Sequence, residues 1–185
     1  MRADARANRQ DLLAAAGRLL EEQGAGMSLR AVAQEAGVGV GTLYRHFPAR
    51  RDLLDAVLED VVARVSAILH AFLDGEAPAE HRWRRLAEEL AAVNLTSLVA
   101  TRDDMDAADR PREALVAEAE RVITGLADRA VAEARRAGLA APDVTGTRYL
   151  SGLLTVTRPA AGELLDRHPD QRGWLLGVYL RGLRP

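Results

Sequence analysis

The chain has 185 residues, 48% of them apolar, and a formal net charge of -2. This is long enough for one or two domains with a hydrophobic core, and too nearly neutral for a chain that is basic throughout. It contains no cysteine, which excludes disulfides and thiolate metal sites. The first ten residues lack the apolar segment of a signal peptide, and no apolar run approaches the length of a membrane span. We therefore expect a cytoplasmic protein that does not associate with membranes.

The charge is distributed unevenly along the chain. Up to Arg51 there are eight arginines and five acidic residues, so the remainder carries the negative excess. A basic N-terminal part on an acidic body is typical of a protein that approaches DNA with one end, although chance surface charge would give the same count.

Two stretches at the N-terminus predict helices. The first covers residues 4–23, where leucines and alanines recur at helical spacing. Residues 28–47 then indicate a helix, a tight turn and a second short helix. Ser28 can cap the first of these, and Gly37 suits the left-handed conformation that ends it. The second helix is too short to be stable alone, so Leu43 and Phe47 must anchor it.

The exposed face of that second short helix has the chemistry of a DNA-recognition helix. Small residues at its start allow close approach to a surface. Hydroxyl, phenol, guanidinium and imidazole groups follow, which can bind phosphate oxygens or base edges. The candidate DNA-binding residues on this helix are Gly39, Val40, Gly41, Thr42, Tyr44, Arg45 and His46.

The run AxxAGVxxGTLYRHFPxRxxLLxAV, within residues 29–57, resembles the DNA-binding domain of the TetR family of bacterial transcription regulators. The spacing and some ten residue identities agree together, which makes the motif specific. Gly39 and Val40 stand where many members have a polar residue, so we expect Arg45 to carry more of the base readout. Phosphate contacts fall to Thr42, Tyr44 and His46. The resemblance extends the DNA-binding set to Ser28, Arg30 and Arg50.

Beyond residue 48 the periodicity predicts further helices and gives no strand signal. The polar stretch 101–110 reads as a short helix or a loop. The expected helices cover residues 49–73, 80–100, 111–137, 143–158 and 169–183. The fold class is therefore all-α. A three-helix DNA-binding domain (1–51) is linked by a long helix to a helical effector-binding and dimerisation domain (52–185).

The resemblance also implies an effector pocket and a dimer interface in the second domain. In the family, small molecules bind among the middle helices, and the last two helices of each subunit form a two-fold interface. Ordinary packing within the subunit is the alternative for every one of these residues. The pocket candidates are Trp83, Leu90, Asn94, Thr96, Met105, Ile123 and Tyr149, and the interface candidates are Gly152, Val156, Gly173, Trp174 and Gly177.

The sequence therefore predicts a homodimeric regulator that binds a near-palindromic double-stranded DNA operator. The expected action is repression that a small-molecule effector releases. The main alternative is a helix–turn–helix protein without such an effector, controlled by a partner or by its own concentration. No cofactor and no metal are expected. The run Gly37-Val38-Gly39-Val40-Gly41 imitates part of a dinucleotide-binding loop, but a helix precedes it where that loop needs a strand. We therefore do not expect an enzyme.

Overall fold

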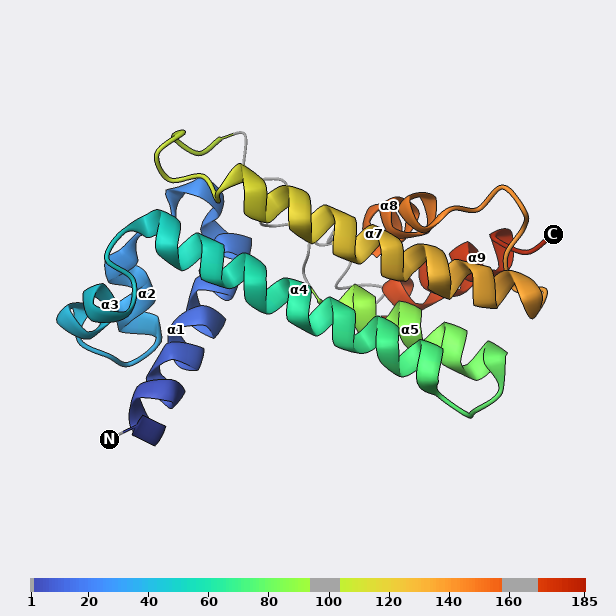
Figure 1. Ribbon diagram of the computed structural model, residues 1–185, viewed down its shortest axis with the longest axis horizontal. Coiled ribbons are helices and arrows are strands. Elements are labelled where there is room, and N and C mark those ends of the chain that lie inside the picture. Colours follow the sequence, from blue (N-terminus) through green and yellow to red (C-terminus); the bar gives the residue numbers. More distant parts are fainter. Residues whose placement is uncertain (1, 94–103, 158–169) are drawn as a thin grey trace. The chain divides into compact units, whose positions relative to one another are not determined.

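The computed structural model describes residues 2–93, 104–157 and 170–185. Every regular element in these residues is a helix, which confirms the expected all-α fold (Figure 1). One short 3-10 helix, η1 (Gly24–Gly26), accompanies the α-helices. The α-helices are α1 (Arg2–Gln23), α2 (Leu29–Glu35), α3 (Val40–His46), α4 (Arg50–Asp74), α5 (Ala79–Ala92), α7 (Glu113–Arg136), α8 (Gly146–Thr157) and α9 (Gln171–Gly182).

The chain divides into two compact units. Unit 1 consists of Met1–Val62 and Leu95–Ala119, and unit 2 of Ala63–Asn94 and Glu120–Pro185. The expected division placed the first domain at residues 1–51. Unit 1 extends beyond residue 51 because the first half of α4 packs with α1–α3. It also includes the later segment Leu95–Ala119. Both α4 and α7 therefore contribute residues to each unit.

Unit 1 is built around one hydrophobic cluster. The apolar faces of α1, α2, α3 and the start of α4 meet in it, and its fully buried side chains include Leu12, Val32, Leu43 and Leu53. Met105 joins the same cluster from the later segment. Short helices such as α2 and α3 cannot persist alone, so this shared burial is what stabilises them.

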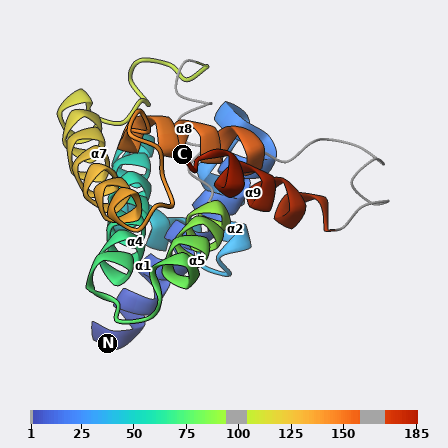
Figure 2. The ribbon, with the colours of Figure 1, turned by 90° about the vertical axis from the view of Figure 1, so that its right-hand side faces the viewer.

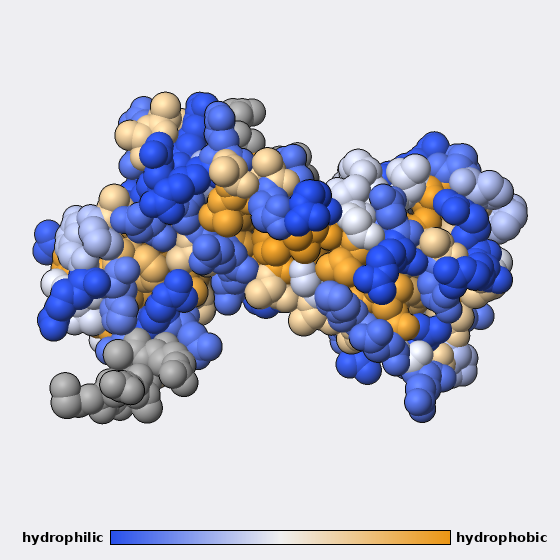
Figure 3. Space-filling view, viewed as in Figure 1, coloured by the Kyte–Doolittle hydropathy of each residue, from blue (hydrophilic) through white to orange (hydrophobic). Residues whose placement is uncertain are grey.

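Unit 2 packs α8 against α9, and α5 against both (Figure 2). Trp83 of α5 lies at its centre, with its ring stacked on Tyr149 of α8 at a centroid distance of 4.5 Å. Tyr149 is fully buried and Trp83 nearly so. On the face shown in Figure 3, polar and charged residues make up most of the outer surface of this unit.

The start of α8 departs from the sequence expectation. The helix begins at Gly146, three residues after the expected start, because Asp128 of α7 accepts a hydrogen bond of 2.7 Å from the Gly146 N–H. A Cβ at residue 146 would lie 2.5 Å from the Asp128 backbone nitrogen, so only glycine fits there. The helix expected over residues 80–100 is shorter in the structure: α5 ends at Ala92, because the backbone of Val93 is extended (φ -84°, ψ 110°). Residues 94–100 lie outside the described residues.

Candidate nucleic-acid interface

The α2–turn–α3 unit has the local geometry that its sequence predicts. Ser28 is extended, and its hydroxyl accepts a hydrogen bond of 3.1 Å from the Ala31 N–H, which caps α2. Gly37 has φ +67°, a conformation that glycine adopts without strain. The Val38 N–H donates to the Ala33 carbonyl at 3.0 Å and closes the end of α2. The turn therefore fixes the direction in which α3 leaves α2.

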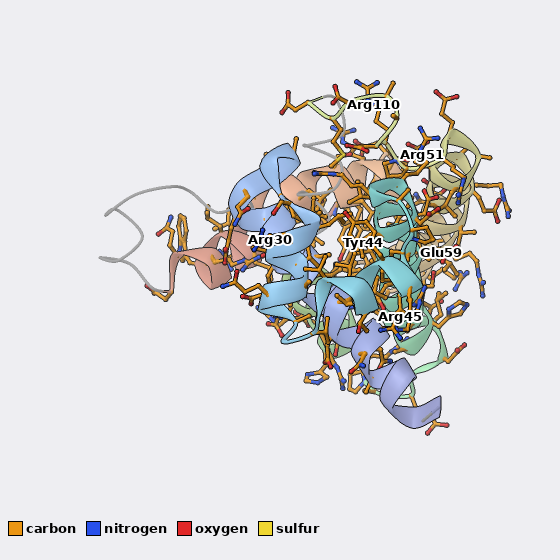
Figure 4. The ribbon with its side chains drawn as sticks, turned by 90° about the vertical axis from the view of Figure 1, so that its left-hand side faces the viewer. Arg30, Tyr44, Arg45, Arg51, Glu59 and Arg110 are labelled. Atoms are coloured by element: carbon orange, nitrogen blue, oxygen red, sulfur yellow. The ribbon has the colours of Figure 1, made fainter. Side chains whose placement is uncertain are left out.

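One face of α3 is buried and the other is open. Leu43 is fully buried and Phe47, directly after the helix, is 3% exposed, so these two side chains hold α3 on the unit. Tyr44 is 49% exposed and Val40 39%. Figure 4 shows Tyr44 and Arg45 on α3 and Arg30 on α2. The Arg45 Nε donates to the Gly41 carbonyl at 3.2 Å, which orients the guanidinium along α3.

The candidate DNA-binding residues differ in how far they are exposed to solvent. Gly39, Val40, Gly41, Tyr44 and Arg45 are exposed, whereas Thr42 and His46 are half-buried. Ser28 and Arg30 are exposed at the start of α2. Small residues at the N-terminal end of α3, followed by a phenol and a guanidinium, form a surface that suits close contact with a duplex groove.

Arg50 is the exception among the candidates, because its guanidinium is occupied within the protein. It donates to the carbonyl oxygens of Met27 and, at 2.8 Å, of Ala25. It also lies 3.7 Å from an Asp109 carboxylate oxygen, and its side chain is 18% exposed. Arg50 thus joins the start of α4 to the segment that enters α2. A contact between Arg50 and DNA stays a prediction.

A second connection in unit 1 was not foreseen from the sequence. Arg112, just before α7, donates its backbone N–H to Asp55 at 2.9 Å and pairs with the same carboxylate through its guanidinium at 2.5 Å. Asp55 is 4% exposed among the apolar residues of α4. A carboxylate at a buried helix position requires a cationic partner, and that requirement is the sequence signal that could have revealed the pair.

Neighbouring groups strengthen this connection. Arg51 donates to the Arg110 carbonyl at 2.9 Å and to the Ala107 carbonyl at 2.6 Å, and Figure 4 shows Arg51 and Arg110 near each other. The Arg112 guanidinium also binds Asp52 at 3.0 Å. Residues 107–112 are therefore held against the first turns of α4. Arg50 ties the same end of α4 to the segment that enters α2.

The effector-pocket candidates are separated by the fold. Trp83, Leu90 and Tyr149 are buried in unit 2, where Ile123 is half-buried. Met105 lies in the core of unit 1. Asn94 and Thr96 lie outside the described residues. Burial raises the pKa of the Tyr149 phenol well above its usual value. Among the described residues, neither its hydroxyl nor the Trp83 indole N–H has a hydrogen-bond partner.

The dimer-interface candidates lie on α8 and α9, which pack together, and they differ in exposure. Trp174 of α9 is 57% exposed, and a Cβ at Gly173 would meet no atom within 4 Å. Gly177 is buried. Gly152 lies directly against the Tyr179 ring, and Val156 is half-buried. The sequence analysis missed Val178, which is 39% exposed one turn after Trp174. The spacing of four residues between two large apolar side chains could have identified it.

Two features are absent from the described residues. No group of histidine and carboxylate side chains there could hold a metal ion. No helix there combines the length and the apolar character that crossing a bilayer needs.

Comparison with known proteins assigns the chain to a family. Residues 12–57 match the family described as bacterial regulatory proteins, tetR family. HTH-type transcriptional regulators of Staphylococcus aureus are 43% identical over 60 residues, so the match spans about a third of their length (32%) and 32% of this chain.

Two solved structures extend the similarity over nearly the whole chain. A TetR transcriptional regulator of Streptomyces coelicolor is 30% identical, with a TM-score of 0.65 over 96% of this chain and 98% of the other. A TetR transcription regulatory protein of Mycobacterium vanbaalenii is 26% identical, with a TM-score of 0.68 over 100% and 99%. The helix–turn–helix geometry and these whole-length similarities lead to one conclusion: the chain belongs to the TetR family of bacterial regulatory proteins.

Proposed function

We propose that this protein is a transcription regulator that binds DNA in a sequence-specific manner through α3. The observation that carries the proposal is the open face of α3, where Tyr44 and Arg45 follow the small residues Val40 and Gly41. We assign Tyr44, Thr42 and His46 to phosphate oxygens. Arg45 faces base edges, because a guanidinium can bind guanine through two hydrogen bonds.

The decisive experiment is fluorescence anisotropy with DNA from upstream of the gene that encodes this chain. A scrambled duplex is measured alongside at several salt concentrations. Site-selective binding that weakens steeply with salt supports the proposal. Tyr44→Ala should weaken binding to both duplexes. Arg45→Ala should reduce the difference between them by about 1–3 kcal/mol, the range for one bidentate base contact.

A matched control variant distinguishes the loss of base recognition from the loss of one positive charge. Arg129→Ala removes the same charge from an exposed position on α7, in unit 2, and should leave the preference between the duplexes unchanged. If Arg45→Ala preserves the preference, the assignment of Arg45 to base readout is wrong. Absence of binding by the unchanged protein at low salt, on genomic fragments as well as on the upstream duplex, refutes the DNA-binding proposal.

We further infer a homodimer, because a two-fold protein presents two recognition helices to a near-palindromic operator. The exposed side chains of Trp174 and Val178 on α9 support an interface there. Sedimentation velocity at micromolar concentration should give a dimer, and Trp174→Glu should shift it to a monomer. Arg129→Glu serves as the surface control. A monomeric unchanged protein overturns this part of the proposal.

The expected action is repression that a small-molecule effector releases. Trp83 and Tyr149 support an effector site in unit 2, since both are buried with polar hydrogens that no described group accepts. A reporter gene behind the upstream DNA should be silenced by the protein. Increased expression would identify an activator instead. The second candidate, a regulator without an effector, is favoured if no small molecule in a metabolite screen lowers the affinity for DNA.

A further inference from the structure

A small basic groove lies between α5 and α9 in unit 2. Its volume is about 180 Å³, and the two helices that form it lie side by side (Figure 2). The side chains of Trp83 and Leu180 contribute apolar wall, and Gly177 keeps the α9 side open. None of the interior candidates Leu90, Ile123 and Tyr149 lines this groove.

Three guanidinium groups and one carboxylate surround the groove. Glu80 pairs with Arg184 at 2.5 Å. Arg84 of α5 and Arg181 of α9 line the same groove, and among the described residues neither side chain has a hydrogen-bond or ion-pair partner. Two exposed guanidinium groups that no described side chain neutralises therefore line one small groove with apolar walls, an arrangement that favours a bound anion.

From this arrangement we propose that the groove binds a small organic carboxylate, with its charged end between Arg84 and Arg181 and its apolar body against Trp83 and Leu180. The planar fork of arginine matches a carboxylate through paired hydrogen bonds. Pockets for drug-sized ligands usually measure about 300–1,000 Å³, so this smaller volume selects a compact molecule. The apolar walls distinguish a carboxylate with a hydrocarbon body from inorganic phosphate.

The site can be tested with a single fluorescent residue. The chain contains two tryptophans, so Trp174→Phe leaves Trp83, in the groove wall, as the only reporter. Benzoate is the probe, benzyl alcohol is its neutral counterpart, and inorganic phosphate is the competing anion. In the full-length Trp174→Phe protein, benzoate should change the Trp83 emission saturably, and added salt should weaken that binding.

Substitutions at the two unpaired arginines identify the site. Arg84→Gln should weaken benzoate binding by roughly three- to tenfold, as expected when one hydrogen bond of typical net strength is lost at an exposed position. The double variant Arg84→Gln/Arg181→Gln should abolish binding. Arg129→Gln removes the same charge outside the groove and should leave the affinity for benzoate unchanged. Arg84 lies on α5 and not on α9, so its variant remains informative if Arg181→Gln alters the oligomeric state in sedimentation.

Three outcomes overturn the proposal. Equal responses to benzoate and benzyl alcohol would show that charge is not recognised. Tighter binding of phosphate than of benzoate would assign the groove to a different anion. Unchanged benzoate binding in the double variant would place the site elsewhere. Each outcome is independent of DNA binding, so the proposed regulatory function stands or falls separately.

Discussion

Gly152 gives the sharpest test of how unit 2 packs. A Cβ at this position would lie 2.6 Å from the Tyr179 hydroxyl oxygen and 2.7 Å from its Cε2, where ordinary contacts are 3.4–4 Å. The tyrosine cannot withdraw freely, because its hydroxyl donates to the Tyr149 carbonyl at 2.6 Å. Gly152→Ala must therefore displace the ring and break or lengthen that hydrogen bond.

The expected cost follows from three contributions. Overpacking costs about 1–3 kcal/mol, and loss of the hydrogen bond adds about 1 kcal/mol. Alanine in place of glycine within a helix returns up to about 1 kcal/mol. The net loss for Gly152→Ala is about 2 kcal/mol. For a chain of this length, that corresponds to a fall in Tm of roughly 4–8 °C.

The assay is urea and thermal unfolding followed by circular dichroism at several protein concentrations. Gly125→Ala on α7 is the matched control, because its Cβ would meet no atom within 4 Å, and this substitution should raise stability slightly. In a Tyr179→Ala background, Gly152→Ala should cost little, since the atoms it strikes are gone. Unchanged stability of Gly152→Ala would refute the argument. A loss that shrinks as protein concentration rises would place Gly152 in the dimer interface instead.

Three further predictions concern single contacts. Ser28→Ala removes the α2 cap and should lower the free energy of unfolding by about 1 kcal/mol, measured by urea denaturation, with Ser28→Thr retaining most of it. Arg112→Gln should cost about 3 kcal/mol, because Asp55 is left buried without its cation, and adding Asp55→Asn should recover part of this; no recovery would contradict the ion-pair explanation. Burial raises the pKa of Tyr179 from 10.0 to about 12, so an ultraviolet titration should show a phenol ionising there. The unfolded phenol ionises first, so this contribution to stability is present below pH 10 and should fall as pH rises through 12; a flat stability profile over that range would contradict it.

Local rules were sufficient to predict the helix–turn–helix from the sequence. A hydroxyl cap, a glycine with positive φ and two apolar anchors specify α2, the turn and α3 without reference to distant parts of the chain. The TetR resemblance, confirmed by the comparisons, rests on that same stretch. Ser28, Gly37 and Leu43 have in the structure the roles that their residue types predict.

Contacts between distant segments could not be predicted in the same way. The TetR resemblance implies a place for Met105 in the effector pocket of the second domain, whereas the structure places it in the core of unit 1. The TetR resemblance implies a place for Gly152 at a dimer interface, and in the structure the ring of Tyr179, 27 positions later in the chain, lies against it. Residue type predicts burial, whereas the partner depends on packing that only the fold determines.

The arginines at the start of α4 show why this distinction matters for function. A phosphate there would offset the unfavourable dipole that a cation meets at a helix N-terminus. In the structure, backbone carbonyl oxygens fill that role for both Arg50 and Arg51. The excess of arginine before residue 52 therefore overstates the charge available to a duplex.

Arg30 and Arg45 remain open on the helix–turn–helix, and Arg9 of α1 is exposed as well, so these side chains can take part in the salt-dependent phosphate contacts. The proposed base contacts require the backbone of α3 to approach the groove closely. Val40 and Gly41 permit that approach because they are small and exposed at its N-terminal end. The proposed base contacts therefore depend on the position of α3, and Arg50, by tying α4 to the entry of α2, helps to set that position.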